Sequence, residues 1–205
     1  MELGQKEYEE INRYCQQKNI MWFASCWDEA SVDFIEQFNP PCYKIPSSRL
    51  TDDELLKYTR AKGKPIILST GMSTLEQIEH AINVLGSDNL VLMHCVGTYP
   101  AKDEDLNLSV ITTYKQKFPD LIIGYSGHEV GVSPSVASAV IGAKVVERHI
   151  TLDRAMWGSD QAASLGPKGI ELLVRDIRLW ELAKGDGIKK LIDAEIPVMK
   201  KLRRK

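Results

Sequence analysis

Short apolar runs alternate with amphipathic stretches along most of this 205-residue chain, and that alternation limits the folds open to it. The apolar runs begin near residues 20, 42, 65, 90, 121 and 144, so one follows another about every 25 residues. Each gap between them carries apolar residues at helical spacing. Strands that alternate with helices pair in parallel, because each helix returns the chain to the same end of the sheet. The sequence therefore predicts an α/β fold with six parallel strands.

Helices are predicted over 5–17, 28–38, 51 onward, 73–85, 110–117, 133–141 and 167–183. Asp28 is a residue type that caps a helix N-terminus. Thr51 with Glu54, and Ser73 with Glu76, match the capping-box pattern of a hydroxyl residue followed three positions later by an acid.

Nearly every predicted strand ends in a polar group that is able to take part in chemistry. These groups are Ser25, Lys44 with Ser47, Ser69, His94, Ser126 with His128, and Glu147 with His149. A barrel gathers all its carboxyl strand ends into one ring, whereas an open sheet uses only those at one switch point. No G-x-G-x-x-G follows a strand, so a dinucleotide fold lacks support. We therefore expect a (βα)8 TIM-type barrel with about six of its eight strands present and the N-terminal two missing.

Composition excludes several classes of protein. The chain has 26 basic and 28 acidic residues, a net charge of −2 and 43% hydrophobic residues. This balance gives no case for nucleic-acid binding, and no apolar run is long enough for a membrane helix. The four cysteines form no C-x-x-C pair, so we expect reduced thiols in a cytoplasmic protein.

Two histidines at the ends of neighbouring strands are candidate metal ligands. In a barrel, His128 and His149 would reach one point above the rim, where water and substrate oxygens complete the coordination of an ion such as Mn²⁺. Two unrelated histidines with local hydrogen bonds remain the alternative. Glu147 shares a strand face with His149, since alternate residues point the same way.

Lys44, His94 and Asp160 are further candidates. A lysine ending an apolar strand should face a polar cleft with an anionic partner. His94 would act as an acid, a base or a hydrogen-bond donor, or else be a satisfied histidine near the core. Asp160 lies in a loop where a carboxylate could bind sugar hydroxyls, although loop aspartates usually form turns.

Several segments together resemble the sialic acid synthase family, which includes N-acetylneuraminate, legionaminate and pseudaminate synthases. They are YKIPS (43–47), GKPIILSTGMSTLEQI (63–78), LMHCVGTYPAKDEDLNL (92–108), IIGYSGHEVG (122–131), GAKVVERHITLDR (142–154) and GSDQAASLGP (158–167). The resemblance implies a barrel transferase that condenses phosphoenolpyruvate with an N-acetylmannosamine-type sugar. The products would be a sialic-acid-type nonulosonate and phosphate, and the cofactor Mn²⁺, or Mg²⁺ or Co²⁺.

The resemblance also implies a role for individual residues, by position. The matching residues are His128 and His149 for the metal; Ser25, Lys44, Ser47 and Ser126 for phosphoenolpyruvate; and Tyr99, Glu147 and Asp160 for the sugar. Glu147 and Lys44, with His94, are the candidate catalytic residues.

Departures from the family pattern motivate an alternative function. Arg49 stands where members usually carry an acid, Gly97 stands where they carry Asn or Ser, and the family's first two strands are expected to be missing. Gln161, where many members carry His, is a further departure. The alternative is a non-catalytic barrel remnant or partner subunit that binds sugar or phosphoenolpyruvate without turnover.

The resemblance also implies a domain division. Residues 1–185 would form a partial barrel domain, and 186–205 a linker toward an absent C-terminal antifreeze-like domain. The full-length form is expected to be a homodimer.

Overall fold

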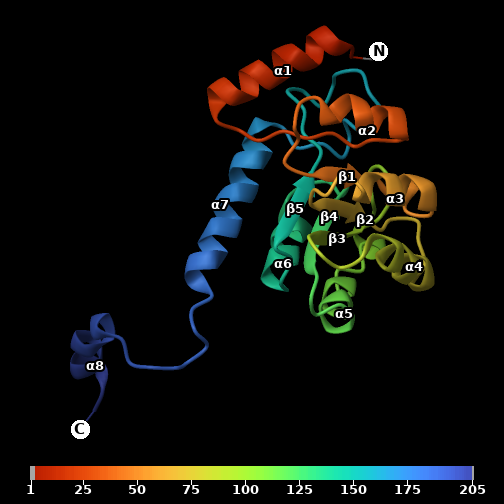
Figure 1. Cartoon of the computed structure of the whole chain (residues 1–205). Coiled ribbons are helices and arrows are strands. Elements are labelled where there is room, and N and C mark those ends of the chain that lie inside the picture. The colour runs from red at the N-terminus through yellow and green to blue at the C-terminus, as the bar shows by residue number, and fades with distance from the viewer. Residues whose placement is uncertain (1–2, 205) are drawn as a thin grey trace.

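The computed structural model describes residues 3–204 and contains one parallel sheet whose strands follow one another in chain order (Figure 1). The strands are β1 (Tyr43–Ile45), β2 (Ile66–Ser69), β3 (Leu90–Cys95), β4 (Ile122–Gly127) and β5 (Val145–Arg148). Each neighbouring pair is parallel, as the strand–helix alternation predicts. The α/β class is therefore confirmed, and the sheet is a curled, five-stranded half-barrel.

The helices match the predicted ranges to within a few residues. They are α1 (Gln5–Lys18), α2 (Glu29–Glu36), α3 (Asp53–Arg60), α4 (Leu75–Leu85), α5 (Val110–Lys117), α6 (Ser133–Val140), α7 (Pro167–Ala183) and α8 (Ile196–Leu202), with 3-10 turns at Ser47–Arg49, Asp103–Asp105 and Asp193–Glu195. Helix α8 lies within the segment predicted only as a linker, and Figure 1 shows it set apart from the sheet. None of the helices in residues 3–204 is long and apolar enough to cross a membrane.

Three of these helices have a side-chain N-cap, and in two of them the cap residue lies one position later than predicted. Asp28 accepts a hydrogen bond from the amide of Ser31, as expected. Helix α3 is capped by Asp52 rather than Thr51. Helix α4 is capped by Thr74, which forms a reciprocal capping box with Gln77. Capping residue types stand side by side at both shifted positions, so the pattern alone does not choose between them.

The first predicted strand, 20–24, is wrong. The chain meets β1 only at one isolated parallel bridge, between Ser25 and Lys44. Strand β1 is three residues long, so it offers few ladder hydrogen bonds to a neighbour. Ile20 and Met21 are 62% and 81% exposed. Trp22 instead packs against the aromatic cluster of Tyr8, Phe34 and Phe38 that joins α1 to α2.

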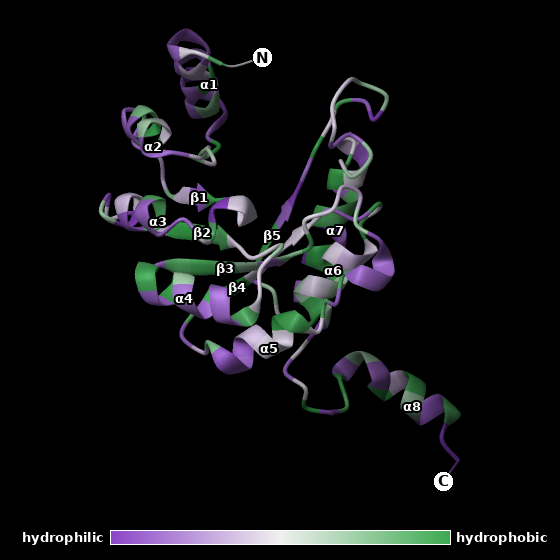
Figure 2. Cartoon of the chain, turned by 90° about the vertical axis from the view of Figure 1, so that its right-hand side faces the viewer, coloured by the Kyte–Doolittle hydropathy of each residue, from purple (hydrophilic) through white to green (hydrophobic). Residues whose placement is uncertain are grey.

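The two faces of the sheet carry different side chains. The helix-covered face holds the main core, which includes Tyr43, Ile66, Leu68, Leu92 and Tyr125. The β3 ribbon is hydrophobic over nearly its whole length (Figure 2). The opposite, concave face carries the alternate residues, and near the carboxyl ends of the strands these become polar.

Candidate active site

A cavity of about 580 Å³ lies on the concave face at the carboxyl ends of the strands. Each strand contributes one inward-facing polar side chain to its wall. In strand order these are Lys44, Ser69, Cys95, Ser126 and Glu147. Parallel strands all end at the same edge of a sheet, so one polar residue per strand is enough to build a continuous polar wall.

The structure brings together every predicted site residue except His94. The cavity is lined by Ser25, Lys44, Ser47, Tyr99, Ser126, His128, Glu147, His149 and Asp160. Further residues line the cavity that the sequence does not predict, among them Phe23, Trp27, Met72 and Cys95. Apolar and thiol side chains near strand ends are also ordinary core residues, so their residue types alone do not indicate a site.

His94 does not line the cavity, and of its two predicted roles the structure supports the satisfied histidine near the core. Its ring is buried on the helix-covered side of β3, where Nε2 lies 2.8 Å from the carbonyl oxygen of Leu106 and the ring contacts Tyr114 edge-on. Burial lowers the pKa of His94 below its ordinary value. Strand alternation is the reason: His94 and Cys95 face opposite sides, and Cys95 is the one that faces the cavity.

Lys44 is held by two partners inside the cavity. Its ammonium donates to Ser69 Oγ at 2.8 Å and lies 3.4 Å from Glu147 Oε1. Ser126 Oγ donates to the same carboxylate oxygen at 2.9 Å. Lys44 is only 7% exposed, so this anionic partner offsets the cost of burying its charge. The expectation of a lysine facing a polar cleft with an acid is met.

Ser47 approaches the end of β2 and β3 closely. Its Oγ accepts a hydrogen bond from the amide of Gly71 at 2.9 Å and lies 3.2 Å from Cys95 Sγ. A Cβ at Gly71 would lie 2.8 Å from that sulfur, so the approach needs a glycine. Burial raises the pKa of the Cys95 thiol, which therefore stays protonated near neutral pH.

The two candidate metal ligands lie side by side, with ring centroids 5.3 Å apart. His128 Nδ1 lies 2.6 Å from the carbonyl oxygen of Val96. A carbonyl oxygen only accepts, so Nδ1 carries the proton and Nε2 keeps its lone pair. Burial lowers the pKa of His128, which favours the neutral ring that a metal requires. His149 Nδ1 lies 3.5 Å from Asp160 Oδ2.

The two imidazoles could supply two ligands to a divalent ion, with water or substrate oxygens in the other positions. Within residues 3–204, no group of three or more His, Cys, Asp or Glu side chains is arranged to hold a metal ion. Tyr99 packs over His128 at 4.1 Å between ring centroids and edge-on against His149 at 5.3 Å, which limits how far either ring can turn.

A family model described as the NeuB family matches residues 1–189 of the chain. The chain belongs to the NeuB family. It is 39% identical over 204 residues to N-acetylneuraminate-9-phosphate synthase of Homo sapiens, a match that covers 98% of this chain and 57% of the human protein. It is 38% identical over 200 residues to N,N'-diacetyllegionaminic acid synthase of Campylobacter jejuni, covering 95% and 60% of the two chains.

The NeuB assignment extends to solved structures. The N-acetylneuraminic acid (sialic acid) synthetase of Leptospira borgpetersenii superposes with a TM-score of 0.88 at 32% identity, covering 100% of this chain and 73% of that one. The chain spans less than two thirds of the length of the human and Campylobacter relatives. The resemblance to sialic acid synthases is thus confirmed at the level of family.

Proposed function

We propose that this chain forms the catalytic part of a (βα)8-barrel synthase that condenses phosphoenolpyruvate with an N-acetylmannosamine-type sugar. The observation that carries the proposal is that Lys44, Ser126 and Glu147 contact one another in a cavity shared with His128 and His149. Membership of the NeuB family supports it. In this proposal residues 1–185 belong to the barrel, 186–205 form a linker, and the full-length enzyme is a cytoplasmic homodimer.

Phosphoenolpyruvate would bind through charge and hydroxyl donors. The substrate carries about three negative charges, and hydrogen bonds between charged groups are the strongest that proteins make. Lys44 is the cation in the wall of the cavity, and Ser25, Ser47 and Ser126 supply hydroxyls around it. Tyr99 and Asp160, beside the two histidines, would contact the sugar.

Glu147 would support the carbon–carbon bond-forming step. The electron pair of the phosphoenolpyruvate double bond forms a bond from C3 to the sugar aldehyde carbon, which leaves positive charge at C2. The Glu147 carboxylate, held by Lys44 and Ser126, stabilises that charge. The aldehyde oxygen becomes an alkoxide in this step. Water then adds to C2, and the C2–O bond to phosphate breaks as the C2 carbonyl forms. Of the two water protons, one ends on the former aldehyde oxygen and the other on the released phosphate. A divalent ion held by His128 and His149 would supply polarisation of the aldehyde oxygen.

A binding protein without turnover is the second candidate, and two residues favour it. Gly97 lines the cavity without a side-chain donor, and a Cβ there would lie 2.9 Å from Met72 Cγ, so a larger residue at this position requires Met72 to move. Arg49 stacks on Trp27 at 5.6 Å and pairs with Asp52 at 3.6 Å, so it does not replace the acid that relatives carry.

Calorimetry and phosphate release together test both candidates. With Mn²⁺ present, the chain should bind phosphoenolpyruvate, and adding N-acetylmannosamine or its 6-phosphate should release inorganic phosphate. His128→Ala and His149→Ala should each lose Mn²⁺ affinity, whereas His80→Ala, on the exposed side of α4, should keep it. Binding without release would favour the second candidate, and unaltered Mn²⁺ affinity in both cavity variants would refute the metal assignment.

A further inference from the structure

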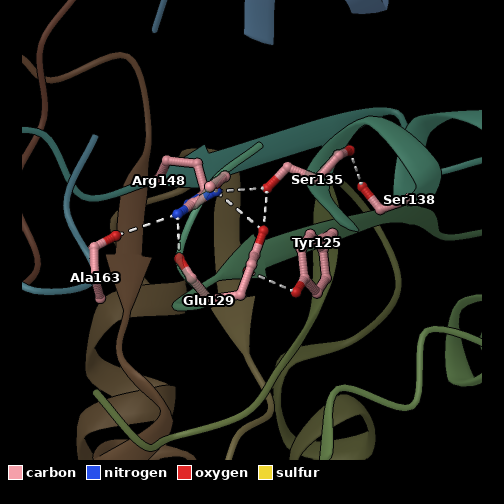
Figure 3. Close-up of polar contacts among 7 residues, drawn as sticks. Tyr125, Glu129, Ser135, Ser138, Arg148 and Ala163 are labelled. Carbon is pink, nitrogen blue, oxygen red and sulfur yellow. Dashed lines mark hydrogen bonds and ion pairs between the residues drawn. The ribbon is translucent and has the colours of Figure 1, made fainter. Parts of the chain in front are cut away.

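Arg148 and Glu129 form a buried ion pair (Figure 3), and each is a sequence neighbour of a cavity histidine. Arg148 Nη1 lies 3.0 Å from Glu129 Oε1, and the two side chains are 3% and 0% exposed. Glu129 follows His128 in the chain, and Arg148 precedes His149. The histidines line the cavity, whereas neither member of the ion pair does. Each charged residue is therefore one peptide bond from a candidate metal ligand.

The arginine holds both the side chain and the backbone of residue 129. Its Nη2 donates to the Glu129 carbonyl oxygen at 2.6 Å, besides the contact of Nη1 with the carboxylate. Tyr125 and Ser135 donate to the same carboxylate at 2.9 and 2.6 Å, as Figure 3 shows. The carboxylate thus has partners on both oxygens, and the backbone beside His128 is tied to the last residue of β5, which precedes His149.

The same guanidinium reaches the loop that carries Asp160. Nη2 also donates to the carbonyl oxygen of Ala163 at 3.1 Å (Figure 3). The amide of Ala163 and the hydroxyl of Ser164 in turn donate to the carbonyl oxygen of Asp160, at 3.1 and 2.8 Å. One side chain therefore joins the three segments that bear His128, His149 and Asp160.

We propose that Arg148 and Glu129 are a positioning pair that sets the relative placement of His128, His149 and Asp160. The inference rests on the proposed metal role of the two imidazoles. A buried ion pair gains little net stability over apolar side chains of the same volume, so a geometric role explains its presence better than a stabilising one. The planar guanidinium has fixed donor directions, and the groups that orient metal ligands control metal affinity.

Strand β4 ends in a glycine, Gly127, beside this ion pair. A Cβ at Gly127 would lie 2.6 Å from Glu129 Oε2 and 2.9 Å from Arg148 Cδ. Residue 127 is paired with Arg148 in the sheet register, so the missing side chain leaves the space that the guanidinium stem and the carboxylate occupy.

Histidine NMR of the metal-free chain tests the inference. The chain has four histidines, so their imidazole nitrogen resonances can be assigned with His→Ala variants. Arg148→Lys keeps the charge and removes the guanidinium fork. The His128 and His149 resonances should shift, while His80 stays in place. Leu56→Ala, in the core away from the cavity, is the control for a general loss of stability and should move neither cavity histidine.

Mn²⁺ titration adds the second readout. Arg148→Lys should weaken Mn²⁺ binding by up to about 10-fold, the lower end of the effect seen for groups bonded directly to a metal ligand, because Arg148 acts one bond further away. Unshifted imidazoles and unchanged affinity in this variant would overturn the inference while the metal proposal stands. A wild-type chain that binds no Mn²⁺ would refute the metal proposal itself. If Arg148→Lys does not fold, Glu129→Gln, which keeps the shape of the acid, takes its place with the same expected results.

Discussion

The ammonium of Lys44 lies 3.4 Å from the carboxylate of Glu147, although the two residues belong to the outermost strands of the sheet. Neighbouring strands are about 4.8 Å apart, so the outer strands of a flat five-stranded sheet would be separated by roughly 19 Å. The two side chains together cannot span that distance. Their contact therefore shows that the sheet curls strongly enough to bring its edges toward each other around the cavity.

Lys44→Met should weaken phosphoenolpyruvate binding by on the order of 10- to 100-fold, corresponding to about 1.5–3 kcal/mol for a hydrogen bond to a charged group. The buried ammonium is the cation of the polar wall, and methionine keeps most of its volume. Calorimetry in the presence of Mn²⁺ measures the change. Lys62→Met is the matched control, because that lysine pairs with Asp33 outside the cavity. Equal affinities in both variants would contradict the assignment of Lys44.

Acid should destabilise the fold partly through His94. Burial lowers the pKa of this ring below its ordinary value of 6.5, so the unfolded chain binds a proton more readily than the folded one. The contribution of His94 to the free energy of unfolding is therefore fully present above pH 6.5 and is lost as the pH falls below that value. In urea unfolding between pH 7.5 and 5, His94→Asn should show a smaller loss of unfolding free energy on acidification than the wild type.

Tyr114→Phe is the control for that pH dependence. It alters a side chain in edge contact with His94 and removes no group that titrates between pH 5 and 7.5. It should lower the unfolding free energy by a similar amount at every pH in this range. If the unfolding free energy of His94→Asn falls with pH as steeply as that of the wild type, the buried ring does not contribute to the pH dependence.

A serine hydroxyl at position 97 should tighten phosphoenolpyruvate binding when the side chain of Met72 is also removed. Met72 is 71% exposed and has a φ of 60°, a conformation that suits glycine. Met72→Gly with Gly97→Ser should therefore bind about 5- to 10-fold more tightly than Met72→Gly alone, as expected for one added hydrogen bond of ~1 kcal/mol. Calorimetry on the two variants gives the comparison, and equal affinities would exclude this position as a donor site.

Thr74→Ala should destabilise the chain by about 1 kcal/mol, because it removes the side chain that caps α4. Ser73→Ala should cost less, since Ser73 Oγ donates only to the nearby carbonyl oxygen of Gly71, at 3.1 Å. Urea unfolding at neutral pH measures both. A larger loss from Ser73→Ala would place the cap where the sequence pattern predicts it, one residue earlier.

Polar residues at the ends of predicted strands account for most of the site. Lys44, Ser126, His128, Glu147 and His149 all lie where polar residues follow apolar runs, and all line the cavity. At β3 the polar residue of the apolar run, His94, faces the helices, and the next residue, Cys95, faces the cavity. Neighbouring residues of a strand point to opposite faces, and the apolar run itself does not fix which of the two faces the cavity.

Local patterns in the sequence determined the order and class of the elements. The spacing of apolar residues predicts helices α1 to α7 and the five strands of the sheet, and the alternation of strands with helices predicts that its four neighbouring strand pairs are parallel. Only the tertiary structure decided that 20–24 does not join the sheet, that the sheet curls until Lys44 meets Glu147, and that Arg148 ties three segments together. The physical reason is the distance along the sequence between the groups that determine each feature. Periodicity and capping depend on residues a few positions apart, whereas pairing, curvature and buried ion pairs depend on groups tens of residues apart, whose contacts form only when the whole chain has folded.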